Sequence, residues 1–168
     1  MKKMWIIGLK SGIITVLGLM AYGLLVMSLG LQPSQGGGLE YVVLALGIYS
    51  GHYYYKAANN GLMTYPQGLK LGLIITSFTG LVNGLIIYLY TQRADPAWIG
   101  NLTKNVQKGL QQKGIGAPMI EEVGQWMQHL TPALLGIGTF ASTVLLGFAL
   151  ALVVTAFSKS LKKVPSQE

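Results

Sequence analysis

Four long apolar runs constrain the fold of this chain more than any other feature of its sequence. The runs lie at residues 12–31, 39–55, 69–90 and 134–157. Each is close to the length of about 20 residues that an α-helix needs to cross the ~30 Å hydrocarbon layer of a membrane. We therefore predict an all-α fold, a four-helix transmembrane bundle within a single integral membrane domain (residues 1–168). The predicted spans cover about residues 5–31, 39–56, 69–91 and 133–157.

The basic residues are placed unevenly about these runs. Eight of the twelve Lys and Arg residues lie beside the same ends of the runs, namely Lys2, Lys3, Lys10, Lys56, Lys70, Lys159, Lys162 and Lys163. The other four lie between the third and fourth runs. Basic residues near span ends are retained on the cytoplasmic side of a membrane. We therefore expect a bacterial inner-membrane protein with cytoplasmic N- and C-termini, whose first span is a retained signal anchor.

Charge and residue content exclude several classes of function. The net charge of +7 comes mainly from lysines at span ends, where topology requires them, so we expect no nucleic-acid partner. The chain has no Cys, which excludes disulfides and Cys-ligated metals. Its two His and five carboxylates are scattered along the sequence, and we assign no cofactor and no metal site. The lipid bilayer is the partner that the composition implies.

A polar segment at residues 95–131 separates the third and fourth runs. Asp95 followed by Pro96 is a helix-start signal. Two amphipathic stretches follow, with glycines between them. Their apolar residues are Ile99, Leu102, Val106 and Leu110 in the first stretch and Ile120, Val123, Trp126, Met127 and Leu130 in the second. We predict an extracytoplasmic amphipathic helical hairpin, which lies on the outer membrane surface or against the bundle.

The first and third runs share a short repeat. GLKSGII at residues 8–14 matches GLKLGLI at residues 68–74 in five of seven positions. Duplication of a two-helix hairpin would give parallel repeats of this kind. Apolar sequence of low complexity also gives such matches by chance, so both origins stay open.

Small residues recur every four positions along the third and fourth spans. This spacing lets helix backbones approach closely in lipid, where no hydrophobic force drives helices together. The pattern predicts either a dimer or partner interface or, as we favour, packing within one bundle. The residues predicted to pack are Gly72, Gly80, Gly84, Thr143, Gly147 and Ala151.

Polar residues within or beside the spans are the candidates for a functional role. Asn83 lies mid-span and either lines a polar pathway or makes an interhelical hydrogen bond, which we favour. Glu40 is a proton or cation site if it is buried, but we favour a solvated residue near a helix N-terminus. His52 is either a pH switch or, as we favour, an amphipathic residue between lipid and water. Thr76 and Thr79 would join Asn83 and Glu40 in lining a transport path.

No motif for catalysis is recognisable in the sequence. The chain lacks a Ser-His-Asp set, a paired carboxylate within one helix, an HExxH motif and a phosphate-binding glycine loop. We therefore predict that the protein is not an enzyme and assign no catalytic residue.

Several segments resemble an uncharacterised bacterial membrane-protein family, the domain-of-unknown-function family 4199. The segments are GLKSGII at residues 8–14, LGIYSGHYYYK at 46–56, GLMTYPQGLKLG at 61–72 and DPAWI at 95–99. The resemblance covers nearly the whole chain. It implies four helices with a polar segment before the last one. It implies no activity, so no functional residue is carried over from the family.

The function that best fits this sequence is that of a non-enzymatic accessory or scaffold protein. Such a protein would bind a partner, or a second copy of itself, through its small-residue helix faces or the outer hairpin. The alternative is a small oligomeric transporter or channel, although a path across lipid needs more polar lining than these spans supply. A lipid-modifying enzyme is the weakest interpretation, because no acid–base pair is present.

Overall fold

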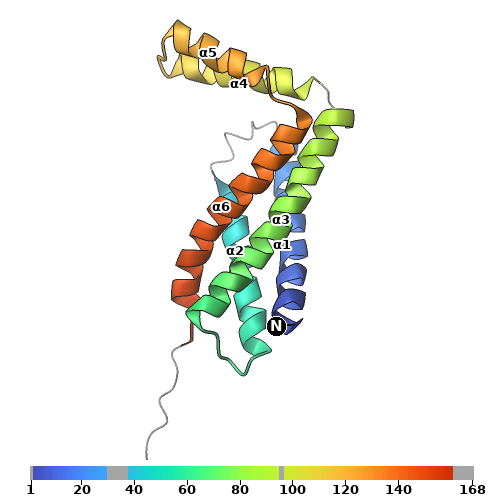
Figure 1. Ribbon diagram of the computed structural model, residues 1–168, viewed down its shortest axis with the longest axis vertical. Coiled ribbons are helices and arrows are strands. Elements are labelled where there is room, and N and C mark those ends of the chain that lie inside the picture. The colour runs from blue at the N-terminus through green and yellow to red at the C-terminus, as the bar shows by residue number, and fades with distance from the viewer. Residues whose placement is uncertain (1, 30–37, 95–96, 161–168) are drawn as a thin grey trace, which may run out of the picture. The chain divides into compact units, whose positions relative to one another are not determined.

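The computed structural model describes residues 2–29, 38–94 and 97–160, and every regular element in these residues is helical. In chain order the elements are α1 (Lys2–Ser28), α2 (Leu39–Ala57), α3 (Tyr65–Leu89), the π-helical turn η2 (Tyr90–Ala94), α4 (Trp98–Gln112), α5 (Ala117–Met127) and α6 (Pro132–Ser158) (Figure 1). The all-α part of the prediction is confirmed. Asp95 and Pro96, the predicted start of the outer hairpin, lie outside the described residues, as do Lys162 and Lys163.

Three stretches in these helices are long and apolar enough to cross a membrane: Lys2–Val26, Tyr65–Arg93 and Pro132–Ser158. The 19-residue helix α2 is not among them. Its hydropathy is lowered by Glu40, His52 and Lys56 and by its tyrosines. Three of the four predicted spans therefore coincide with helices that meet the requirements for a membrane crossing.

The chain divides into two units. The first contains Met1–Val82 and Phe140–Glu168, and its described part holds α1, α2 and most of α3 and α6. The second runs from Asn83 to Thr139 and contains the end of α3, η2, α4, α5 and the start of α6.

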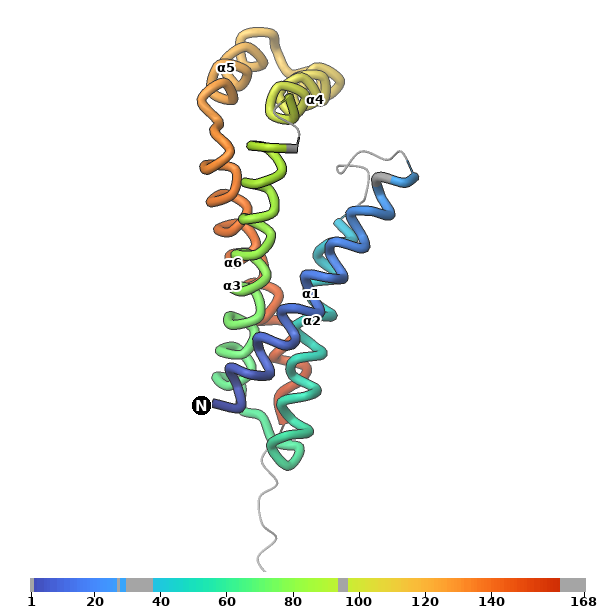
Figure 2. The backbone as a smooth tube through the Cα atoms, turned by 90° about the vertical axis from the view of Figure 1, so that its right-hand side faces the viewer, coloured from blue at the N-terminus to red at the C-terminus, as the bar shows by residue number. Residues whose placement is uncertain are grey.

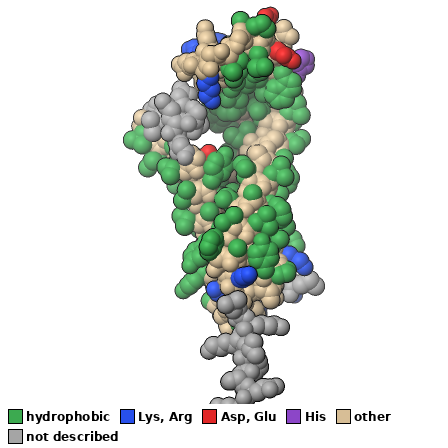
Figure 3. Space-filling view, turned by 90° about the vertical axis from the view of Figure 1, so that its left-hand side faces the viewer, with side chains coloured by type: hydrophobic (Ala, Val, Ile, Leu, Met, Phe, Trp, Pro, Cys, Tyr) green, Lys and Arg blue, Asp and Glu red, His purple; other side chains and the backbone are tan. Residues whose placement is uncertain are grey.

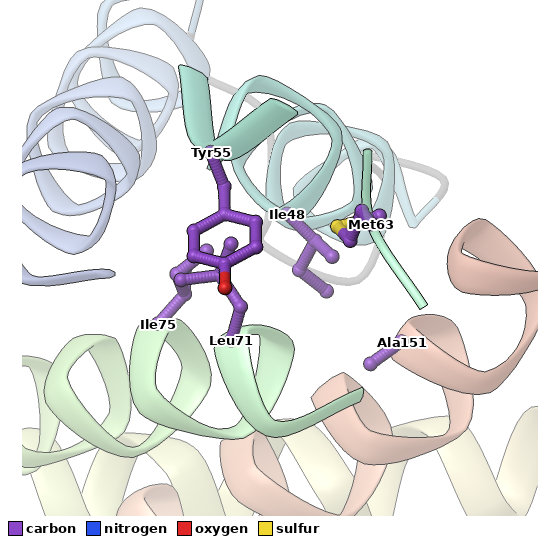
Figure 4. Close-up of a cluster of buried hydrophobic side chains, with 6 residues drawn as sticks. All are labelled: Ile48, Tyr55, Met63, Leu71, Ile75 and Ala151. Carbon is purple, nitrogen blue, oxygen red and sulfur yellow. The ribbon is translucent and has the colours of Figure 1, made fainter. Parts of the chain in front are cut away.

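In the first unit, α1, α2, α3 and α6 lie side by side (Figures 1 and 2). Tyr55 points from α2 toward Leu71 and Ile75 of α3, and Ala151 faces this group from α6 (Figure 4). The other members of this buried cluster are Ile48 and Met63. In a membrane such a cluster stabilises the bundle through close packing, because lipid is as apolar as the side chains themselves.

The outward surfaces of the long helices are apolar. Leu17, Leu24 and Leu145 are 59%, 68% and 70% exposed. Apolar side chains cover much of the middle part of the helices on the face drawn in Figure 3. A helix that is apolar all round is typical of a protein core or a membrane span. Because these leucines are exposed rather than buried in protein, lipid is the solvent that fits them.

The turn between α2 and α3 uses two left-handed residues. Asn60 and Gly61 have φ angles of 52° and 77°. The Gly61 N–H donates to Lys56 O at 2.8 Å, and Asn59 Nδ2 donates to Leu62 O at 2.7 Å. Glycine and asparagine tolerate this backbone region better than other residues, so the NNG sequence here forms the reversal.

In the second unit, α4 and α5 pack against each other. Gly124 of α5 lies against the side chain of Gln107 of α4, where no Cβ would fit without movement of the amide. The connection contains Gly114 with a φ angle of 73°. Its N–H donates to Gln111 O at 3.0 Å, which closes the end of α4.

Candidate functional site

Buried polar side chains in the described part of the first unit fall into two sets. One set consists of hydroxyl side chains in the helices, and those of Ser11, Thr15, Thr76 and Thr155 lie against glycines of a neighbouring helix. The other set is a cluster around His52, at the end of the unit where α2, the α2–α3 turn and the end of α6 come together. The buried polar residues are Ser11, Thr15, His52, Thr76, Thr79, Thr155 and Ser158.

Hydroxyl side chains of α1 face glycines of α2. Thr15 lies so close to Gly47 that no Cβ would fit there. Ser11 lies beside Gly51, whose missing Cβ also leaves room for Ile75 of α3. The Thr15 hydroxyl donates to Ser11 O at 2.7 Å and is satisfied within its own helix. Small residues on one helix thus let the other approach closely, as expected for helices that associate in lipid.

The same arrangement joins α3 to α6 in the first unit. A Cβ added at Gly72 would lie 2.6 Å from the Ala151 Cβ. Thr76, which is fully buried, fills the space at Gly147. The sequence predicted Gly72, Gly147 and Ala151 as packing positions, whereas Thr76 was a candidate for a polar path. In the structure they meet one another within one chain.

The remaining predicted packing residues also lie where α3 and α6 meet. A Cβ added at Gly80 would lie 3.0 Å from Phe140 O and 3.2 Å from the Thr143 Cβ. In the second unit, a Cβ added at Gly136 would lie 2.8 Å from Gly84 O. Close backbone approach therefore continues along these two helices in each unit.

Glycines of α1 take part in packing that the sequence analysis missed. A Cβ added at Gly8 would lie 2.5 Å from Ile74 Cγ2, and one at Gly12 would lie 2.8 Å from Phe78 Cδ1. These two glycines are four residues apart, the same spacing that marked the third and fourth spans. The spacing of four therefore also marks α1 as a packing helix, although the sequence prediction used Gly8 and Gly12 only in the repeat with residues 68–74.

His52 lies at the centre of the second set. Its side chain is 0% exposed. The Nδ1 atom lies 2.6 Å from Ser158 Oγ of α6, and Nε2 lies 3.0 Å from Gly68 O of α3. The structure therefore differs from the favoured interpretation of His52 as a residue between lipid and water. Burial is tolerated because both ring nitrogens have hydrogen-bond partners.

The distances around His52 constrain where its protons lie. The Nε2–H must donate to Gly68, because a carbonyl oxygen only accepts. Ser158 has one hydroxyl hydrogen, and its oxygen lies 2.7 Å from Val154 O as well as 2.6 Å from the ring. A neutral ring leaves one of these two contacts without a hydrogen. A neutral ring with its hydrogen on Nε2 accepts at Nδ1 from the Ser158 hydroxyl, and the full burial of the ring near Lys56 favours this uncharged form over an imidazolium.

Further hydrogen bonds tie the end of α6 to the α2–α3 turn. Lys56 Nζ donates to Ser158 O at 3.1 Å. The Ser160 N–H donates to Met63 O at 2.9 Å, and its hydroxyl donates to Gly61 O at 2.7 Å. A cation at the last carbonyls of a helix interacts favourably with the helix dipole. The cluster thus caps α6 with groups from α2 and the turn.

A Ser hydroxyl beside a His nitrogen is also how a nucleophile and its general base are arranged. Here the pair is closed to solvent, with Ser158 6% and His52 0% exposed. The Ser158 hydroxyl is held against Val154 of its own helix, a common position for a helical serine. A substrate would not reach this oxygen, so the geometry fits a connection between helices rather than a catalytic dyad.

The other predicted polar candidates lie apart from this cluster. Glu40 is half-buried at the start of α2 and hydrogen-bonds with Tyr22 of α1. Its Oε2 atom is buried and has no hydrogen-bond partner among the described residues. Thr79 is fully buried, and its hydroxyl likewise has no partner in the part of the chain that the structure describes. Asn83 is half-buried on α3 in the second unit.

Metal-ligating side chains do not gather in the described ranges, where no group of three or more His, Cys, Asp and Glu residues could hold an ion. No curated protein and no solved structure matches this chain. One family model does match, that of a protein of unknown function (DUF4199), over residues 7–160. The match begins within α1 and ends just past α6, so it includes the glycine contacts and the His52 cluster. The chain therefore belongs to the DUF4199 family.

Proposed function

We propose that this protein is an integral protein of a bacterial inner membrane with four spans, and that it acts as a non-enzymatic accessory or scaffold subunit. Three helices with the length and hydropathy of spans support the membrane part of the proposal. The exposed leucines on α1 and α6 give these helices lipid-compatible outer surfaces.

The fourth span in this proposal is α2. At about 1.5 Å per residue its 19 residues are about 28 Å long, close to the thickness of the hydrocarbon layer. Glu40 and His52 are turned toward the bundle, whereas most of the tyrosines of α2 are exposed. Glu40 pairs with Tyr22, and His52 is fully buried. A low hydropathy is therefore compatible with a crossing, because neighbouring helices cover His52 and part of Glu40, and tyrosines are tolerated near the boundary between lipid and water.

The orientation in this proposal has both termini in the cytoplasm. Lys56 ends α2, Lys70 lies in the first turns of α3, and Lys159 follows α6. Basic residues at these helix ends belong on the cytoplasmic side. The α4–α5 pair then lies outside the cytoplasm, between the third and fourth spans.

The observation that carries the scaffold role is the use of the buried polar groups. His52 is a fully buried titratable side chain, and its two nitrogens lie within hydrogen-bond distance of groups on α3 and α6. The hydroxyls of Thr15 and Thr76 bond to their own helices, and both side chains pack against glycines. Groups used in this way serve helix association rather than turnover.

The partner site in this proposal is the α4–α5 pair, since the predicted small-residue faces are used in packing within the chain. Lys104, Lys108 and Glu121 are among the residues that line a groove between the two helices, together with Ala117 and Ile120. Such a groove on the outer side would be accessible to a periplasmic domain or a neighbouring membrane protein.

Affinity capture from mild detergent, with quantitative mass spectrometry, tests this role. We expect one protein to be recovered in near-stoichiometric amount with the wild type and to be lost with a Lys104→Glu/Lys108→Glu variant. Lys113→Glu is the matched control, since Lys113 is exposed but does not line the groove. Recovery of the chain alone, or a partner that is retained by the groove variant, would contradict the proposal.

Glu40 favours a second function, a small oligomeric transporter or channel. Its Oε2 atom is buried with no hydrogen-bond partner in the described part of the chain, and a buried carboxylate within a span is costly and usually functional. In proteoliposomes this alternative predicts a proton or cation flux that Glu40→Gln abolishes and Tyr41→Phe, on the neighbouring exposed residue, leaves intact. Equal leakage from wild-type and Glu40→Gln liposomes would exclude it.

A further inference from the structure

The groove of the α4–α5 pair is lined by charged, amide and apolar side chains. The two helices contact each other where Gly124 meets Gln107. Beside this contact, the groove is lined by Lys104, Lys108 and Gln111 of α4 and by Ala117, Ile120 and Glu121 on the other side. Charged and amide side chains therefore gather on a single face of the pair.

Apolar side chains of α5 lie on the other side of the same contact. Met119, Val123, Trp126 and Leu130 recur at intervals of four, three and four residues, so at about 100° per residue they form one row. Met119 and Trp126 are 57% and 66% exposed. Gly124 is the residue of α5 that touches α4. Viewed along the axis of α5, the apolar row lies on one side of Gly124 and Glu121 lies on the other.

The apolar row of α4 lies on the matching side. Ile99, Leu102, Val106 and Leu110 are half-buried and occupy one face of that helix. Seen around the axis, Lys104 and Lys108 lie on one side of Gln107 and this row lies on the other. The α4–α5 pair is therefore a two-helix plate with one polar face and one apolar face.

Chain continuity holds this plate beside the candidate spans. The candidate span Tyr65–Arg93 precedes α4, and the candidate span Pro132–Ser158 follows α5, each after a short linker. Neither end of the plate can therefore move far from the point where a span leaves the membrane. An exposed tryptophan close to a span end is typical of the boundary between lipid and water.

We propose that the apolar face of the α4–α5 plate inserts into the lipid interface, with Trp126 as its anchor between headgroups and acyl chains. This rests on the membrane location proposed above. An amphipathic helix lies in this zone with its apolar face buried about 5–10 Å into the headgroup–acyl boundary. The groove then faces water, where it is available to a protein partner.

Tryptophan fluorescence of the full chain in phosphatidylcholine vesicles tests the proposal. Replacing Trp5 and Trp98 by Phe leaves Trp126 as the reporter. Phosphatidylcholine brominated near the headgroup end of its acyl chains should lower the Trp126 emission by about twofold, because the ring lies at the depth of the bromines. Iodide added to the water should have little effect.

A matched reporter is obtained by moving the tryptophan to Gln125 in a Trp126→Phe background. Gln125 is exposed and lies one residue away, outside the apolar row. Its emission should be quenched by iodide rather than by brominated lipid. A third reporter, Met119→Trp in the same background, tests the far end of α5. Lipid quenching at position 119 is expected, since a plate lying flat places the whole row in the interface.

Two results would overturn the inference. Strong iodide quenching of Trp126 would place the ring in water, and protection from both quenchers would place the row against protein, either this chain or a second copy. A Leu145→Trp reporter, on the 70% exposed outer surface of α6, separates these failures from failure of the membrane assignment. If Leu145→Trp is quenched by brominated lipid and Trp126 is not, the membrane proposal survives and this inference does not.

Discussion

Glycines in these helices differ in what surrounds them, although they look alike in sequence. Gly72 faces Ala151 across a gap that leaves no room for a methyl group, whereas Gly23 of α1 has nothing within 4 Å of where a Cβ would lie. In the interior of a helix, glycine costs about 0.5–1 kcal/mol relative to alanine. At Gly72 that cost is offset by close contact between helices, and at Gly23 it is not.

We therefore expect opposite effects from the same substitution at these two positions. Gly72→Ala should lower the free energy of unfolding by about 1–3 kcal/mol, because it overpacks the contact with Ala151. Gly23→Ala should be neutral or raise it by up to about 1 kcal/mol through helix propensity. Denaturant unfolding in detergent, followed by circular dichroism, measures both. Equal changes in the two variants would show that Gly72 is not a contact position.

The His52–Ser158 pair should be energetically coupled. Hydrogen bonds between helices in membranes contribute about 0.6 to 2 kcal/mol. A double-mutant cycle of His52→Ala and Ser158→Ala should give a coupling of about 1 kcal/mol, since either substitution removes the bond that joins α2 to α6.

His129 provides the control for this cycle. It is exposed just past the end of α5, where its Nδ1 lies 3.0 Å from Gln125 O one turn earlier. His129→Ala combined with Ser158→Ala should be additive. Additive behaviour of the His52 cycle itself would contradict the assigned connection.

At the scale of elements, the α2–α3 turn determines how the two helices reverse direction. Gly61 adopts a left-handed backbone with open space around it, so a side chain there meets backbone strain but no clash. Gly61→Ala should cost about 1–2 kcal/mol, the usual penalty for this region. Gly61→Asn should cost less, because asparagine tolerates the left-handed region. Thermal unfolding of the two variants tests the order, and equal losses would contradict it.

The helices themselves could be predicted from sequence, and so could the candidates for packing. Apolar runs and lysines locate the long helices because both follow from the thickness and polarity of a membrane. Small residues that recur every four positions lie on one face of a helix, and this pattern predicts Gly72 and Gly147 as packing positions. It does not say which helix covers that face, so the contacts of Gly8 and Gly12 with α3 were not predicted.

The His52 cluster shows what a one-dimensional pattern leaves out. His52 and Ser158 are 106 residues apart, and neither belongs to a motif. In the sequence, a histidine followed by three tyrosines and a lysine is typical of the boundary between lipid and water. Only the packing of α6 against α2 and α3 shows that the ring is buried and has partners on both sides.

At the scale of the whole molecule, the proposed topology depends on whether α2 crosses the membrane. With four spans the α2–α3 turn is cytoplasmic and the α4–α5 pair is outside. With three spans, α2 would stay on the outer side, so the turn would be outside and the α4–α5 pair would be cytoplasmic. In both topologies Asn59 and Gln112 lie on opposite sides of the membrane. With four spans Asn59 is cytoplasmic, and with three spans Gln112 is.

Cysteine labelling measures this directly, since the natural chain has no Cys. Asn59→Cys and Gln112→Cys each place a single thiol at an exposed position, one in the α2–α3 turn and one at the end of α4. A membrane-impermeant maleimide applied to intact spheroplasts should label Gln112→Cys at once and Asn59→Cys only after permeabilisation. Labelling of Asn59→Cys in intact spheroplasts, with Gln112→Cys protected, would contradict the four-span account.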